Sequence, residues 1–199
     1  MTTTQILAKE GIKGGLVLLV LFLLAVAAGS EFFIILFLLV LGFWLFMFRN
    51  PERLPSERLS NALMAPCDGV IENIEYASDA ILVTLKIGLL DVGVLRAPFV
   101  MQNPSFQKQE GLSVYLASDE KKEALNARYG LKVEDFEMTV TPELFGAKIY
   151  GLGSFCTGER IGFCKVGRLR LQLKPNFVEL KVNIGDIVKS GETLLGYVR

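Results

Sequence analysis

The strongest pattern in the chain is a pair of long apolar runs near its start. Residues 14–28 and 32–48 are apolar and uncharged, and a break of three residues, Gly29 to Glu31, separates them. A full crossing takes roughly 20 residues, so these arms predict two helices that form either a tilted hairpin or a shallow re-entrant wedge. A cleaved signal peptide is disfavoured, because a second apolar run follows at once and no small-residue cleavage site leads into a polar start.

Basic residues flank this segment on both sides and are absent from its turn. They are Lys9, Lys13, Arg49, Arg53 and Arg58. Because positive charge favours the cytoplasmic side, both ends of the segment are predicted to lie at the cytoplasmic face of the cell membrane. The chain is therefore divided into a membrane anchor, residues 1–49, and one further domain, residues 50–199, which has an ordinary size for a domain.

After the apolar runs, the pattern changes to short segments with period-two alternation and frequent Gly and Pro. Such alternation predicts strands that bury one face, here Ala80–Ile87, Arg168–Leu173 and Val178–Val182. One short helix is predicted over Ser118–Tyr129, where Ser118 can cap it and a run of charged residues follows. The expected fold class is an α-helical membrane hairpin followed by a mainly antiparallel β domain.

The C-terminal stretch, Val182–Val198, contains an IleGlyAsp and a SerGlyGlu segment with a short strand between them. Glycine supplies the positive φ that such tight turns demand. This tail resembles the closing hammerhead of barrel-sandwich hybrid domains, a group that includes biotinyl and lipoyl carriers and secretion adaptors. The adaptors also carry long coiled-coil heptads, which are absent here. The resemblance indicates an architecture and no particular chemistry.

Composition removes several function classes. Lys plus Arg and Asp plus Glu both number 21, so no net field favours nucleic acid. The chain has no histidine, which is the most common general base near neutral pH and the most common metal ligand. Its three cysteines, Cys67, Cys156 and Cys164, lack the paired spacing of a zinc site or a disulfide framework. Neither a metal nor a nucleic-acid partner is therefore expected.

Four segments in order resemble one family over nearly the whole chain. They are FRNPER (Phe48–Arg53), APCDGVI (Ala65–Ile71), LDVGVLRAP (Leu90–Pro98) and GERIGFCKVGRLRLQL (Gly158–Leu173). They are similar to FRDPER, SPADGVI, DVHVNRAP and GERxGxIRFGSRVDLYL of the short, proenzyme-type, membrane-anchored phosphatidylserine decarboxylases. The resemblance implies a phosphatidylserine decarboxylase-like fold that includes the C-terminal hammerhead.

The resemblance also implies how working members act. A serine attacks the preceding peptide carbonyl, and elimination leaves a pyruvoyl group that serves as an electron sink for loss of carbon dioxide. The family arranges an Asp, a His and this Ser as orienter, base and nucleophile. Asp68 stands at the position of the Asp, although in an AspGly turn it can also simply bond its own backbone. Gly93 replaces the His, and the Ser is lost between Gly167 and Arg168.

These departures predict a relative that makes no pyruvoyl cofactor and acts in phospholipid metabolism as a lipid-binding or scaffolding protein. Ala127, between Asn126 and Arg128, also replaces the Glu of the NER segment of the family. The alternative is an active decarboxylase that forms phosphatidylethanolamine from phosphatidylserine after cleavage at Ser154, which lies in a LeuGlySer tripeptide like that of longer decarboxylases. The first hypothesis predicts an intact chain, and the second predicts two fragments.

Two further hypotheses concern basic residues. Lys165 precedes the IleGlyAsp turn much as a biotinylated or lipoylated lysine does, but it lacks the MetLysMet context of a carrier and matches an Arg of the decarboxylase motif. The second hypothesis is that basic residues bind anionic phospholipid headgroups. The alternative is that they are solvated surface charges with no ligand. The candidate lipid-binding residues are Arg49, Arg53, Arg58, Lys165 and Arg168. The expected partners are the phospholipid membrane and either a second copy of the chain or a companion lipid enzyme.

Overall fold

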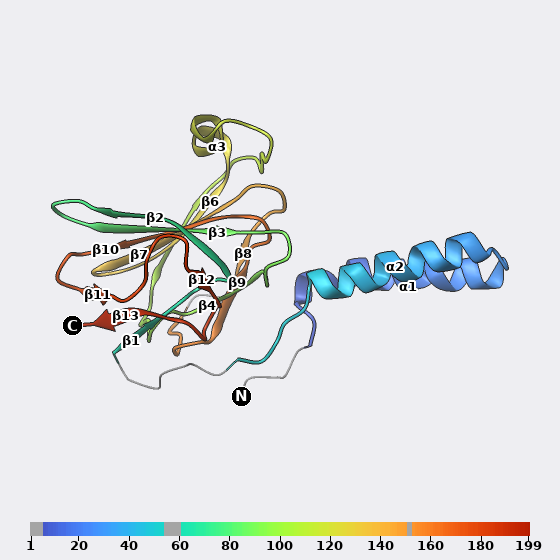
Figure 1. The fold of residues 1–199 in the computed structure, drawn as a ribbon, viewed down its shortest axis with the longest axis horizontal. Helices are drawn as coiled ribbons and strands as arrows, with labels where there is room; N and C mark the ends of the chain where they lie inside the picture. The colour runs from blue at the N-terminus through green and yellow to red at the C-terminus, as the bar shows by residue number, and fades with distance from the viewer. Residues whose placement is uncertain (1–5, 54–60, 151–152) are drawn as a thin grey trace. The chain divides into compact units, whose positions relative to one another are not determined.

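The computed structural model describes residues 6–53, 61–150 and 153–199. The chain divides into two compact units, Met1–Glu52 and Arg53–Arg199. The first unit is helical and the second is mainly β (Figure 1). Each unit is described separately below.

The first unit is an antiparallel pair of helices, α1 (Lys9–Ala27) and α2 (Glu31–Met47). Close approach of the two is possible because α1 presents glycines to aromatic rings of α2. A Cβ at Gly14 would lie 2.2 Å from Cζ2 of Trp44, and one at Gly11 would lie 2.4 Å from Cβ of Phe48. The indole Nε1 of Trp44 donates to the carbonyl of Gly11 at 2.8 Å. This contact and the backbone bond from Ala8 N to the Phe48 carbonyl join the open ends of the two helices.

The helical unit is apolar on its outside as well as at the contact between its helices. Most large side chains of both helices are exposed within the unit, for example Leu24 on α1 and Leu39 on α2. A helix that is apolar all round is stable in a lipid environment or in a protein core. Among the described helices, α1 is long and apolar enough to cross a bilayer, and α2 is a shorter apolar helix of 17 residues.

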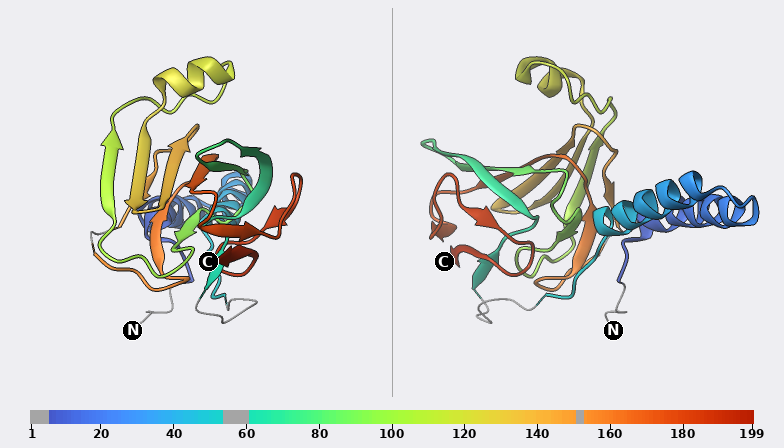
Figure 2. Two further views of the ribbon diagram at one scale, coloured as in Figure 1. Left: turned by 90° about the vertical axis from the view of Figure 1, so that its left-hand side faces the viewer. Right: turned by 45° about the vertical axis from the view of Figure 1, so that its right-hand side comes forward.

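The second unit contains thirteen described strands and one short helix (Figures 1 and 2). Their bounds are β1 (Ala62–Met64), β2 (Gly69–Tyr76), β3 (Ile81–Ile87), β4 (Val94–Arg96), β5 (Ser105–Gln109), α3 (Asp119–Leu125), β6 (Arg128–Val133), β7 (Phe136–Pro142), β8 (Lys148–Ile149), β9 (Arg160–Phe163), β10 (Gly167–Leu173), β11 (Val178–Leu180), β12 (Ile187–Val188) and β13 (Leu194–Val198).

These strands form three antiparallel sheets. The largest has the order β12-β2-β3-β10-β7-β6-β5, and the two smaller sheets have the orders β1-β13-β11 and β4-β9-β8. In β10 the leucines at 169, 171 and 173 are fully buried, whereas Arg168, Arg170 and Gln172 point to the other face. Period-two alternation thus gives the large sheet one core face and one polar face, on which the site described below lies.

The predicted mainly antiparallel β domain is confirmed, and two of its three predicted strands agree within one residue. The third predicted strand ends at Leu180 in place of Val182. The predicted helix over Ser118–Tyr129 is too long, because α3 ends at Leu125 and Arg128 begins β6. Pairing of β6 with β5 and β7 takes precedence over the local helical preference there. In the anchor, α1 begins at Lys9, five residues before the predicted start.

Candidate functional site

Within the second unit, the segments Ala65–Ile71, Leu90–Pro98 and Gly158–Leu173 lie near one end of the seven-stranded sheet. Gly167, the first residue of β10, pairs with Ile87 at the end of β3 and with Pro142 at the end of β7. The preceding residue, Val166, has a φ of 61°, in the left-handed region that β-branched residues rarely adopt. The backbone therefore turns sharply just before β10, at the place where the resemblance predicts the cleavage serine of the family.

Asp68 lies between β1 and β2, and its carboxylate is fully engaged. Arg53 donates to both oxygens of the carboxylate, with Nη2 at 2.7 Å from Oδ2. The backbone N–H of Ser190 donates to Oδ1 at 2.8 Å, and that of Val92 donates to Oδ2 at 3.4 Å. The side chains of Arg53 and Asp68 are only 10% and 9% exposed. This arrangement clamps three distant segments together, which is a structural role that the sequence left open for Asp68.

Gly93, at the predicted position of the base, is packed too tightly for any side chain. A Cβ there would lie 2.8 Å from the ring carbons Cε2 and Cζ of Phe163 and 3.0 Å from the carbonyl oxygen of Cys164. Phe163 is itself buried. The space that a base would need beside Gly93 is thus occupied by an aromatic ring.

Two of the three cysteines, Cys67 and Cys164, are buried. Burial raises the pKa of the Cys67 thiol well above its usual value, with Asp68, Cys164 and Asp91 adding to the effect. Burial also raises the pKa of Cys164 to about 12, with a smaller contribution from Glu143. Both thiols therefore stay protonated and unreactive near neutral pH.

Lys165 is fully buried, and its Nζ donates to the carbonyl of Asp91. A side chain in this position reaches neither a headgroup nor an enzyme that modifies lysine. Its burial argues against Lys165 as a lipid-binding residue and against the carrier hypothesis. Period-two alternation does not predict this burial, because Lys165 lies in the turn before β10 and not in a strand.

Arg168 is the centre of an ion-pair cluster on the polar face of the sheet. Its Nη2 lies 2.9 Å from Oδ1 of Asp119, and its Nε lies 3.0 Å from Oε2 of Glu72 and 3.6 Å from Oε1 of Glu143. Glu143 is buried and also pairs with Lys122 at 2.9 Å. The hydrogen bond and the charge of Arg168 lower the pKa of Asp119. The guanidinium of Arg168 is therefore already balanced by carboxylates.

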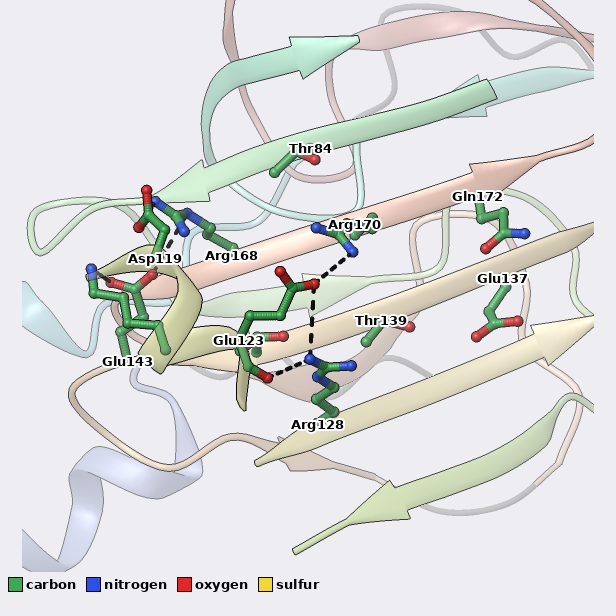
Figure 3. A pocket seen from close by; sticks show the side chains of 12 residues that line it. Thr84, Asp119, Glu123, Arg128, Glu137, Thr139, Glu143, Arg168, Arg170 and Gln172 are labelled. Carbon is green, nitrogen blue, oxygen red and sulfur yellow. Dashed lines mark hydrogen bonds and ion pairs between the residues drawn. The ribbon is translucent and has the colours of Figure 1, made fainter. Parts of the chain in front are cut away.

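This cluster forms one wall of a polar pocket of about 370 Å³ between α3 and the sheet (Figure 3). Along the pocket, Arg170 pairs with Glu123, and Arg128 donates to the carbonyl of the same Glu123. The lining contains as many carboxylates as cations. Its charged residues are Asp119, Glu123, Glu137, Glu143, Lys122, Arg128, Arg168 and Arg170. Such a pocket suits a polar or zwitterionic ligand better than a simple anion.

Sequence reasoning found Arg168 but missed Glu143 and Lys122. Glu143 follows directly after β7 and has no motif around it, and Lys122 looked like part of a solvated charged face. One signal could have indicated Lys122: the predicted helix is followed at once by a strand, so the charged side chains of the helix are expected close to the sheet. No group of three or more Cys, Asp or Glu side chains in the described residues is arranged to hold a metal ion.

The remaining candidates do not join this site. Ser154 is exposed, and its Oγ lies 3.4 Å from the backbone N of Asn103, which donates to it. Its hydrogen bonds within the described residues are to Asn103, and none connects it to Asp68. Arg49 donates to the Phe46 carbonyl at 3.0 Å and stacks over the Phe46 ring at 4.1 Å. Arg58 lies outside the described residues.

A pyruvoyl group does not fit the residues at the start of β10. Such a group forms from a serine of the chain itself, and residues 164–168 read Cys, Lys, Val, Gly and Arg. The single nucleophile among them that could replace a serine hydroxyl, the thiol of Cys164, is buried and held protonated by its raised pKa. No catalytic step through a pyruvoyl group is therefore derived for this place.

Comparison with known proteins places this geometry in a family. The chain is 29% identical over 196 residues to a phosphatidylserine decarboxylase proenzyme of Desulfotalea psychrophila, covering 89% of this chain and 90% of the relative. It is 27% identical over 175 residues to the proenzyme of Salinibacter ruber, covering 79% and 77%. No family model and no solved structure matches the chain. With 30% identity over 187 residues to the proenzyme of Geobacter sulfurreducens, covering 85% of this chain and 82% of that one, the protein belongs to the phosphatidylserine decarboxylase family.

Proposed function

We propose that this protein is a membrane-anchored member of the phosphatidylserine decarboxylase family that binds phospholipid and does not form a pyruvoyl group. Membership of the family implies a role in phospholipid metabolism. The main support for a loss of catalysis is the packing at Gly93, where Phe163 and the Cys164 carbonyl fill the space that a base would need. The absence of a hydroxyl in residues 164–168 supports the same conclusion.

The finer architecture belongs to the same proposal. The tail turns at Gly185 and Gly191, which have φ values of 93° and 69°, and β12 lies between them. This geometry supports a barrel-sandwich hammerhead that closes the domain. The apolar α1 and α2 act as the membrane anchor with both ends on the cytoplasmic side. A homodimer or a companion lipid enzyme is the proposed partner of such a scaffold.

The intact mass of the purified full chain tests the proposal. One species near 22.0 kDa, together with phospholipid that copurifies and is extracted by organic solvent, is the expected result. Two chains, of which the second begins with a pyruvoyl-blocked residue 154, would instead establish the active alternative. A Ser154→Ala variant is the matched control, because this exposed side chain can be changed with little effect on the fold.

The alternative keeps one observation in its favour. Ser154 is accessible, and Gly153 before it has a φ of 156°, which favours glycine, with nothing within 4 Å of an added Cβ. Self-cleavage there still requires a base for the hydroxyl, and the described contacts of Ser154 provide only the Asn103 amide. Incubation of the purified chain followed by mass measurement at several times separates slow cleavage from none.

A further inference from the structure

An unusual number of exposed apolar side chains lies at the end of the seven-stranded sheet that holds the site. We call this set the apolar end, and its members come from four segments of the chain. They are Leu89, Leu90, Leu112, Tyr115, Leu116, Leu125, Leu144 and Phe145. Leu116 is 92% exposed and Leu112 is 60% exposed. A contiguous patch of this kind on a soluble surface usually marks an interaction site.

Strand pairing shows that these segments share one end of the sheet. β3 and β7 both end opposite Gly167, so the segments after them, which carry Leu89, Leu90, Leu144 and Phe145, leave the sheet together. β5 ends opposite Arg128, where β6 begins, so the stretch from Gln109 to α3 leaves the sheet at the same end. Leu112 and Leu125 are held together by a 2.8 Å backbone hydrogen bond.

The opposite end of the same sheet has a different character. There the turns β2–β3 and β6–β7 lie beside the end of β10, because Leu173 pairs with Ile81 and with Phe136. These turns and the residue after β10 carry Asp79, Glu134, Asp135 and Lys174, which line a polar depression. The two ends therefore differ as the membrane side and the water side of a peripheral protein differ.

Cations accompany the apolar residues at the apolar end. A second hollow, of about 510 Å³, is lined by Tyr115, Leu116 and Ala117, by the cations Lys86, Lys122 and Arg168, and by the carboxylate of Glu143, which pairs with Lys122 and Arg168. The Nζ of Lys122 lies 5.4 Å from the centre of the Tyr115 ring. Aromatic rings beside long basic side chains are typical of a membrane interface, where the ring enters the headgroup layer.

We propose that the apolar end docks onto the surface of a phospholipid bilayer, with Leu116 and its neighbours in the acyl boundary and the polar pocket of Figure 3 at headgroup level. The chain itself identifies this occupant, because α1 is long and apolar enough to hold a bilayer within reach. Met47 and Ala62 are joined by chain that spans at most about 50 Å when fully extended. This inference deepens the proposed phospholipid-binding function and rests on it.

The test uses the full chain in vesicles and one fluorescent label at a time. Cys156 is the exposed thiol and is changed to Ser, whereas Cys67 and Cys164 are buried and do not react. A polarity-sensitive dye is then attached to Leu116→Cys and, as the matched control, to Tyr76→Cys. Tyr76 is 72% exposed and lies at the opposite end of the sheet, paired with Ile81.

The dye at position 116 is expected to shift to the blue and to lose most of its fluorescence when the acyl chains carry bromine. The dye at position 76 is expected to keep its emission in the same vesicles. An unquenched label at position 116, or equal quenching at both positions, would overturn the docking proposal. If phospholipid still copurifies with the intact chain in that case, the proposed function stands and only the docking surface is wrong.

A charge variant provides a second readout that does not depend on a dye. Leu116→Glu is expected to fold normally because the side chain is almost fully exposed, and it places a carboxylate where the proposal has acyl chains. In a chain labelled at Tyr76→Cys, the Leu116→Glu substitution should leave the emission of the label unchanged. Added to a chain labelled at Leu112→Cys, it should reduce the quenching by brominated lipid, and unchanged quenching would count against docking.

Discussion

At the scale of single residues, the charged groups of the site already have hydrogen-bond or ion-pair partners within the chain. Asp68 accepts from Arg53, Ser190 and Val92, and Arg168 is surrounded by three carboxylates. A catalytic carboxylate needs a free oxygen or a proton to exchange with its substrate. Both oxygens of Asp68 already accept hydrogen bonds from the chain, so we interpret Asp68 as a structural clamp.

Replacement of Asp68 by Ala is expected to cost about 3–5 kcal/mol of unfolding free energy, since it leaves the largely buried Arg53 guanidinium with only Glu192, at 3.9 Å, as a carboxylate partner. Chemical denaturation of the full chain measures this loss. Asp135→Ala is the control, because its pair with Lys174 is solvent-exposed and such pairs contribute little to stability. Arg53→Met combined with Asp68→Ala should recover part of the loss. Equal stability of the wild type and Asp68→Ala would refute the clamp.

Gly93 allows a second test at this scale. Gly93→Ala is expected to destabilise the domain by about 1–3 kcal/mol, because the new methyl group overlaps the Phe163 ring. Gly146→Ala is the matched control, with nothing within 4 Å of the added Cβ. Phe163→Leu in the Gly93→Ala background should restore part of the stability. A Gly93→Ala chain as stable as the control would show that space for a base exists after all.

At the scale of elements, the strands of the sheet were predictable and their partners were not. Alternation in Ala80–Ile87 and Arg168–Leu173 reflects burial of one face, which a sequence records directly. The clamp at Asp68 joins Ser190, which is 122 residues away, and no local pattern records such a distance. The helix over Ser118–Tyr129 was predicted too long for the same reason, since pairing of β6 with distant strands decides where α3 ends.

The anchor shows the same difference between a pattern and its contacts. Two helices followed from the apolar runs, but only the structure shows that Gly11 and Gly14 receive the rings of Phe48 and Trp44. Close helix pairing in lipid depends on such small residues, because lipid is as apolar as leucine and only packing favours association. The predicted apolar run begins at Gly14 and leaves Gly11 outside it, and the sequence does not indicate which side either glycine faces.

Gly14→Ala is therefore expected to separate the helices around Trp44 and to weaken their pairing by about 1–3 kcal/mol. Trp44 is the single tryptophan of the chain, so its emission reports this contact without a label. We expect a shift in its emission maximum and a lower fluorescence anisotropy, because the ring loses its hydrogen bond to Gly11. Gly42→Ala, which meets nothing within 4 Å, should leave the spectrum as it is. Identical spectra for both variants would contradict the close packing.

At the scale of the whole molecule, helix length decides whether the anchor crosses the bilayer. At about 1.5 Å per residue, α1 with 19 residues and α2 with 17 are roughly 28 and 25 Å long. The hydrocarbon core is about 30 Å thick, and a small mismatch is absorbed by local thinning. We propose that such thinning lets both helices cross as a hairpin and not as a re-entrant wedge, with the basic residues at both of its ends on one side.

A spanning hairpin predicts that its turn and the β domain lie on opposite sides of the membrane. In a Cys156→Ser background, Glu31→Cys should react with an impermeant maleimide added to intact cells, because Glu31 is exposed at the start of α2. In the wild-type chain, Cys156 should react only after lysis, since it lies in the β domain and is its exposed thiol. A Glu31→Cys chain that reacts only after lysis would mean that the anchor re-enters on one side. Reaction of Cys156 in intact cells would instead place the domain outside, and a lipid-binding function would then concern the outer leaflet.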